Sequence, residues 1–193
     1  FVMRFQQLTG PIMAKGVEDT ALYRFYPLSS LMEVGANLYA FGLSVEHFHQ
    51  NNTDRLSHWP HSMLASSTHD TKRSEDVRAR INVLSEIPEE WDAAISRWRQ
   101  LTDKYKKKEQ TEIIPHPNEE YLFYQTLIGS WPLDDNVDQN FIERIQNYMV
   151  KALKEAKVHT SWVNPNYSYE TLMKDFVKNV LSDDSFLRDF RIL

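Results

Sequence analysis

The chain has 193 residues, of which 41% are hydrophobic, and a formal net charge of −5. This length suffices for one or two packed domains, while the acidic balance excludes the clustered basic face that binds nucleic acid. No apolar run approaches the ~18 residues that span a membrane, and the lack of cysteine excludes disulfides and thiolate metal sites, which favours a cytoplasmic protein without a membrane partner.

Short elements and breaks alternate in the first half of the chain. The sequence predicts a helix over 44–51 and, after Pro60, a short buried strand over 62–68. Ser74 can cap a second helix with acidic residues in its first turn, and Pro88 would end it. The apolar stripe of this second helix, which would face a sheet or barrel, consists of Val77, Ile81 and Leu84.

Helical periodicity is strongest after Pro88, where three apolar stripes predict core-facing helices. The first stripe is Trp91, Ala94, Ile95, Trp98 and Leu101; the second is Phe141, Ile145, Tyr148, Met149, Ala152 and Ala156; the third, behind Ser168 as N-cap, is Tyr169, Leu172, Met173, Phe176, Val180 and Leu181. A further helix is predicted over 118–128. The charged segment 104–117, with its two prolines, is the predicted flexible connector.

Eight ionisable side chains lie between Ala65 and Arg80. The predicted strand leads into His69 and Asp70, after which the chain turns into the second helix. Barrels of alternating strands and helices place their chemistry at such C-terminal strand ends. The residues alone leave open the alternative that Asp70 caps the turn and that His69 is a hydrogen-bonded packing residue.

Two long motifs are similar to those of one enzyme family. One reads STHDTKRSEDVRAR at 67–80, and the other reads GPIMAKGVEDTALYR at 10–24. Shorter matches lie within 83–91, 124–132, 144–157 and 160–166. On these residues the chain resembles maltooligosyl trehalose synthase, a member of the α-amylase superfamily, and the resemblance covers most of the sequence.

The resemblance implies a mainly α-helical fragment of a (β/α)8-barrel glycosidase-like enzyme, with one short barrel strand, its helix and a helical subdomain. The expected division is a helical segment with AKGVEDT at 1–60, a strand, loop and helix with STHDTKRSED at 61–88, and a helical subdomain at 89–193. Where the family reads LNEVGG, this chain has Met32 and Ala36. We therefore do not assign the family's sugar-contacting role to this loop.

In that family the reducing-end α-1,4 link of a maltooligosaccharide becomes an α,α-1,1 link, an intramolecular transglycosylation of trehalose biosynthesis that implies no cofactor. This chemistry requires a carboxylate nucleophile and a general acid about 5 Å apart. The resemblance implies that Asp70 is a third carboxylate, which stabilises the transition state, and that His69 binds the sugar. It also implies that Lys72, Arg73 and Lys15 are substrate-binding residues.

The family's nucleophilic Asp, in a GxRxD pattern, and its acid Glu have no counterpart in this sequence. We therefore expect this chain to be part of a catalytic domain and to be inactive alone. Its expected partners are a maltooligosaccharide or α-1,4-glucan substrate and the missing remainder of that domain. The alternative is a non-catalytic helical module that binds glucan or another protein.

Several side chains keep two interpretations. Glu18 and Asp19 could cap a helix or pair with Arg24, or they could belong to the site. Aromatic residues in the helical stripes are expected in the core rather than as sugar platforms. The better candidates for sugar stacking are those beside prolines or loops, namely Trp59, Trp131 and Trp162.

The histidine spacing does not favour a metal site. His47 and His49 would point in different directions on a helix. His58 and His61 have a compatible spacing but no evident third ligand nearby. We therefore expect no bound metal.

Overall fold

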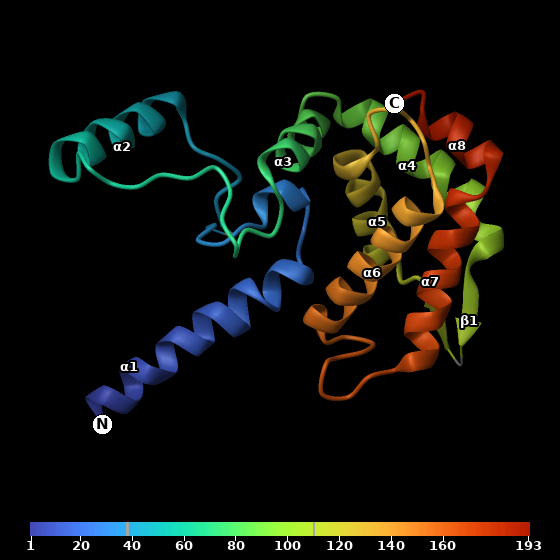
Figure 1. The fold of residues 1–193 in the computed structure, drawn as a ribbon, viewed down its shortest axis with the longest axis horizontal. Coiled ribbons are helices and arrows are strands. Elements are labelled where there is room, and N and C mark those ends of the chain that lie inside the picture. Colours follow the sequence, from blue (N-terminus) through green and yellow to red (C-terminus); the bar gives the residue numbers. More distant parts are fainter. Residues whose placement is uncertain (38, 110) are drawn as a thin grey trace.

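The structure is a computed structural model that describes residues 1–37, 39–109 and 111–193 (Figure 1). The α-helices are α1 (Val2–Pro11), α2 (Val45–His58), α3 (Glu75–Asn82), α4 (Pro88–Thr102), α5 (Pro117–Ser130), α6 (Gln139–Ala156), α7 (Tyr167–Leu181) and α8 (Asp184–Phe190). Shorter turns of helix are η1 (Ile12–Glu18), η2 (Ala21–Tyr23), η3 (Ser29–Leu31), η4 (Val83–Ser85) and η5 (Asp103–Tyr105), and two strands are β1 (Lys107–Glu109) and β2 (Glu112–Ile114). The prediction of a mainly α-helical chain is confirmed.

A helical body forms around α5, which packs against α3 and α6. Phe123, Tyr124 and Leu127 of α5 are fully buried, as expected for a helix with neighbours on several sides. Gly129 allows α3 to approach, because a Cβ there would lie 2.7 Å from Val77 Cγ1. This close contact fixes the start of α3 and, with it, the loop that carries His69 and Asp70.

The three predicted apolar stripes face the interior of this body. Trp91 and Trp98 of α4, Met149 of α6 and Phe176 of α7 are buried. In α6 and α7 the buried positions recur with helical spacing, and the two helices pack against each other. Burial of these stripes supplies the main favourable contribution to folding.

The predicted strand at 62–68 is wrong for this chain: these residues form no strand, and residues 61–70 are exposed. Strand N–H and C=O groups need a neighbouring strand. Among the described residues the two strands, β1 and β2, pair only with each other. A barrel strand therefore has no partner within the part of the chain that the structure describes.

Three local predictions are also corrected. The segment 104–117, predicted to be flexible, contains the β1–β2 hairpin, in which Lys107 faces Ile114 and Ile114 is buried. Its residue Gln110 lies outside the described residues. Pro88 does not end a helix but begins α4. Proline is favoured there because backbone N–H groups in the first turn of a helix have no hydrogen-bond acceptor within the helix. The N-cap of α7 is Asn166, whose side chain accepts a hydrogen bond from the backbone, rather than Ser168.

The helices α1 and α2 extend away from the helical body (Figure 1). No described residue within 1–21 or 33–80 is buried, although several are large and apolar. Examples are Phe5 and Leu8 on α1, and Phe48 and Leu56 on α2. Clusters of exposed apolar side chains are typical of interaction surfaces.

No helix of the described chain has both the length and the apolar character needed to cross a membrane. The division into 1–60, 61–88 and 89–193 stays a prediction.

A buried carboxylate lies at the start of α5. Glu119 is 8% exposed, and it accepts hydrogen bonds from the Tyr169 hydroxyl and, at 3.0 Å, from the backbone N–H of His116. Burial raises the pKa of Glu119 to about 7, against the opposing effect of these hydrogen bonds. The His159 ring stacks on Tyr169 with centroids 4.7 Å apart, and burial lowers the pKa of His159.

These shifts predict a dependence of stability on pH. Between the ordinary pKa of 4.5 and about 7, folded Glu119 keeps a proton that unfolded Glu119 releases, so its contribution to stability is complete below pH 4.5 and is lost as pH rises through 7. We expect this group to lower the free energy of unfolding by ~1–3 kcal/mol between pH 5 and pH 8. His159, with its lowered pKa, contributes a slope of opposite sign.

Urea denaturation of the wild type and of Glu119→Gln at several pH values isolates this contribution. The glutamine variant keeps a polar group at position 119 that cannot titrate, and it keeps His159, whose Nε2 lies 3.7 Å from Glu119 Oε1 in the wild type. We expect its free energy of unfolding to change with pH in the direction that His159 dictates. Equal slopes for the two proteins would contradict the assignment to Glu119.

Candidate functional site

The loop before α3 carries the predicted catalytic residue. Thr71 Oγ1 donates to the backbone oxygen of Thr68 at 2.8 Å and lies 3.1 Å from Ser67 Oγ, and these contacts close a tight turn. His69 and Asp70 stand exposed at the tip of the turn. Among the ion pairs of the described residues, none includes Asp70. Its carboxylate is thus free to meet a ligand.

Asp19 brings together two of the predicted binding residues. Lys72 Nζ lies 2.8 Å from Asp19 Oδ1, although the two residues are 53 positions apart. Lys15 Nζ pairs with Asp19 Oδ2. Lys72 is only 9% exposed at its side chain, whereas that of Lys15 is 71% exposed. The site therefore contains one inner and one outer ammonium group on a shared carboxylate.

Mutual contacts favour the ionised forms of Asp19 and Lys15. Burial opposes the ionisation of Asp19, but hydrogen bonds from Lys15 and Lys72 outweigh it and lower the pKa of Asp19. The hydrogen bond to Asp19 raises the pKa of Lys15, and the negative charges of Glu155 and Asp70 add to this effect. Asp70 therefore lies within electrostatic reach of Lys15.

Arg73 points into the helical body instead of towards this cluster. Its guanidinium donates to the backbone oxygen of Ser29 at 3.2 Å and to the Tyr148 hydroxyl at 2.6 Å. It also lines, with Lys72 and Arg144, a cavity of about 420 Å³. These contacts hold the loop against α6, and the substrate-binding role of Arg73 stays a prediction.

Glu33 positions the loop, and sequence reasoning missed it. Its Oε1 accepts the backbone N–H of Lys72 at 2.6 Å, and its Oε2 accepts that of Arg73 at 3.2 Å. The adjacent Met32, where the family has Asn, is 5% exposed and packs in the core. Only the match to the family's LNEVGG pattern could have drawn attention to this glutamate, because the contact joins residues 39 positions apart.

Asp19 forms no pair with Arg24, one of the two interpretations open from the sequence. Arg24 donates instead to the backbone oxygens of Ala156 and Lys157 at the end of α6. Glu18 accepts a hydrogen bond from the backbone of Gly35 at 3.2 Å. The segment that carries Lys15 is thereby joined to both α6 and the Glu33 loop.

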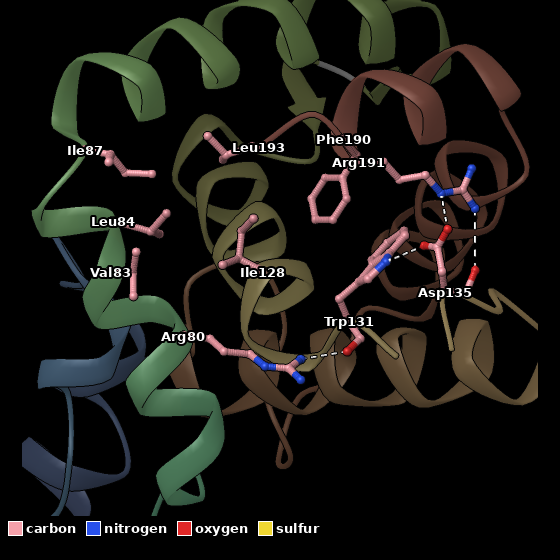
Figure 2. Close-up of a pocket in the computed structure, with 10 residues that line it drawn as sticks. All are labelled: Arg80, Val83, Leu84, Ile87, Ile128, Trp131, Asp135, Phe190, Arg191 and Leu193. Atoms are coloured by element: carbon pink, nitrogen blue, oxygen red, sulfur yellow. Dashed lines mark hydrogen bonds and ion pairs between the residues drawn. The ribbon is translucent and has the colours of Figure 1, made fainter. Parts of the chain in front are cut away.

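The three tryptophans predicted for sugar stacking lie in different places. Trp59 is 73% exposed and Trp162 57% exposed. Figure 2 shows Trp131 in the wall of an apolar cavity of about 520 Å³, where it packs against Phe190 at 4.4 Å between ring centroids. Its indole N–H donates to Asp135, which also pairs with Arg191. None of the residues that line this cavity belongs to the Lys15 and Asp70 cluster.

Metal ligands do not gather in the part of the chain that the structure describes: no three His, Asp or Glu side chains are placed to hold an ion together. The site therefore consists of carboxylate, ammonium and imidazole groups at the surface of a helical body. The groups of Lys15, His69 and Asp70 are exposed, and such groups can bind a polar ligand by hydrogen bonds and can stabilise charge on it.

This fold and site define a helical segment with an exposed turn that carries acidic and basic side chains. No family model matches the sequence. It is 40% identical over 168 residues to a putative maltooligosyl trehalose synthase of Mycobacterium tuberculosis, a match that covers 87% of this chain and 21% of the relative.

Solved structures agree with this match. The chain superposes on a hypothetical maltooligosyl trehalose synthase of Sulfolobus tokodaii with a TM-score of 0.86 and 38% identity, over 99% of this chain and 25% of that structure. It also superposes on a solved structure of DSM5389 glycosyltrehalose synthase with a TM-score of 0.82 and 44% identity. This match covers 98% of this chain and 24% of that structure. The predicted resemblance to maltooligosyl trehalose synthases is confirmed, over a segment that spans about a quarter of the length of these proteins.

Proposed function

We propose that this chain is the acceptor-side part of a maltooligosyl trehalose synthase, a (1→4)-α-D-glucan 1-α-D-glucosylmutase. Such an enzyme is an isomerase that turns the reducing-end α-1,4 link of a maltooligosaccharide into an α,α-1,1 link. The observation that carries the proposal is the cluster in which Asp19 holds Lys15 and Lys72 beside the free carboxylate of Asp70. The choice of this reaction for the cluster rests on the similarity to the relatives.

In this proposal Asp70 stabilises the transition state. Positive charge develops on the transferred glucosyl ring as its bond to the leaving oxygen breaks, and a nearby carboxylate stabilises that charge. Asp19 engages both ammonium groups, so Lys72 does not neutralise Asp70. The arrangement leaves the Asp70 carboxylate without a described ion-pair partner at the turn.

The other residues would hold the glucose that is both leaving group and acceptor. Ammonium and imidazole N–H groups donate to sugar hydroxyls, a role that we assign to Lys15, Lys72 and His69. Arg73 would hold the loop in position through its hydrogen bonds to Ser29 and Tyr148. No cofactor is needed for this exchange of one glycosidic bond for another.

The nucleophile and the general acid would come from the remainder of the catalytic domain, which we propose as the polypeptide partner of this chain. The exposed apolar faces of α1 and α2 support this, because they have no partner among the described residues. The same faces support the alternative of a non-catalytic interaction module. A cytoplasmic location stays a prediction from composition.

A chimera tests the proposal. The 168 matched residues of the Mycobacterium tuberculosis relative are replaced by those of this chain, and maltopentaose turnover is followed by loss of reducing ends and by the α,α-1,1 anomeric signal in NMR. We expect turnover by the chimera and none by the chain alone. A folded chimera without activity would contradict the proposed function, whereas activity of the chain alone would contradict the absence of its nucleophile and acid.

A further inference from the structure

A groove of about 460 Å³ lies beside Lys15. Its lining includes Lys15, Asp19, Glu155, Lys157, Ser161 and Trp162. These residues come from η1, the end of α6 and the loop between α6 and α7. The groove therefore adjoins the proposed site and shares Lys15 and Asp19 with it.

Trp162 is held in a fixed orientation although it is 57% exposed. Its indole N–H donates to Glu155 Oε1 at 3.1 Å, and the ammonium group of Lys154 lies over its ring, 4.9 Å from the centroid. Lys154 is in turn fixed by Glu170 at 3.2 Å. One edge and one face of the indole are thus occupied, and the remaining exposure leaves apolar ring surface open to solvent.

The loop itself keeps the ring outside the core. The backbone N–H of Asn164 donates to Ser161 Oγ at 2.9 Å, and the N–H of Ser161 donates to the Asn164 oxygen at 3.3 Å. These bonds close a turn around Trp162 and Val163, which are both exposed. An exposed, immobilised indole loses little conformational entropy when a ligand stacks on it.

The charges of the groove favour a neutral ligand. Two ammonium groups, of Lys15 and Lys157, face two carboxylates, of Asp19 and Glu155, so the lining has no net charge. An ammonium has three donors and a carboxylate about four acceptor positions, whereas the contacts described here use only some of them. Alternating donors and acceptors beside an aromatic face match the hydroxyls and the apolar ring face of a sugar.

We propose that this groove binds a glucosyl unit of an α-1,4-glucan, with Trp162 as the stacking surface and with Lys15, Lys157 and Glu155 as partners for its hydroxyls. The neutral-sugar class follows from the groove, and the choice of α-1,4-glucan rests on the proposed function. No residue of the Asp70 turn lines the groove, so binding here does not require catalysis.

Titration of the ¹⁵N-labelled chain with maltopentaose tests this inference. The chain has five tryptophans, and the spectrum of Trp162→Phe identifies the indole signal of Trp162. We expect this signal to shift with added maltopentaose, because its N–H lies at the groove. In Trp162→Ala the dissociation constant should rise about tenfold through loss of the stacking surface.

Phe48→Ala is the matched control, because Phe48 on α2 is also an exposed aromatic residue and lies outside the groove. Its affinity should stay within about twofold of the wild type. The amide spectrum of each variant reports whether the fold is kept. Unchanged affinity in Trp162→Ala, equal shifts with the β-linked cellopentaose, or no shift with maltopentaose would each overturn the inference.

Failure of this inference is distinguishable from failure of the proposed function. The proposed function is measured by turnover in the chimera, which needs the Asp70 turn. If the chimera converts maltopentaose and Trp162→Ala binds the sugar with normal affinity, the inference about the groove is wrong and the proposed function is supported. If the isolated chain binds maltopentaose through Trp162 and the folded chimera is inactive, the inference about the groove is supported and the proposed synthase function is wrong.

Discussion

Asp70→Asn in the chimeric enzyme should lower kcat for maltopentaose by about 10²- to 10³-fold, while KM changes by less than about threefold. Asparagine keeps the size and the hydrogen-bonding oxygen of the side chain but removes its charge. In our proposal that charge acts on the developing positive charge of the transition state, which the ground-state sugar lacks. Steady-state kinetics from the loss of reducing ends measure both constants.

Asp76→Asn is the matched control for this prediction. Asp76 is also exposed and lies six positions along the same segment, in the first turn of α3. Its removal should leave kcat within about twofold, because a surface charge there makes no contact with the proposed site. Asp70→Asn should also unfold at the same temperature as its parent, since Asp70 is exposed and forms no described ion pair. Normal turnover in Asp70→Asn would exclude this residue from the mechanism.

The helices were predictable because their information is local. Apolar residues at helical spacing predict which face is buried, and Trp98, Met149 and Phe176 are indeed buried. The strand at 62–68 was not predictable in the same way, because a strand depends on a neighbour that the pattern does not specify. Its residues have β-favouring character but remain exposed where the described chain offers no pairing edge.

The contacts within the candidate site could not be predicted from the sequence, although the resemblance names candidate residues. The resemblance selected Lys15 and Lys72, yet nothing in the spacing of the sequence shows that Asp19 binds both. The same holds for Glu33, whose carboxylate fixes the backbone of Lys72. Such contacts depend on how η1 and the loops pack on the helical body. Tertiary packing, not local pattern, decides which of several nearby carboxylates pairs with a given lysine.

Trp98→Ala should lower the free energy of unfolding by ~3–5 kcal/mol. Trp98 is fully buried, and its ring lies 4.9 Å from that of Phe190, 5.4 Å from that of Tyr124 and 5.7 Å from that of Trp91, centroid to centroid. Its indole N–H also donates to Asp189 at 2.8 Å. Alanine would leave a large cavity between α4, α5 and α8, and it would remove one of the partners of Asp189.

Urea denaturation followed by circular dichroism measures this loss, with Trp59→Ala as the control. Trp59 is 73% exposed, so its removal should change the free energy of unfolding by less than about 0.5 kcal/mol. The comparison separates burial from residue type, because the same side chain is removed in both variants. Similar stability of the two variants would mean that α4 does not pack on α8 through Trp98 in solution. A large loss for Trp98→Ala alone would show that burial of this indole between α4, α5 and α8 stabilises the helical body.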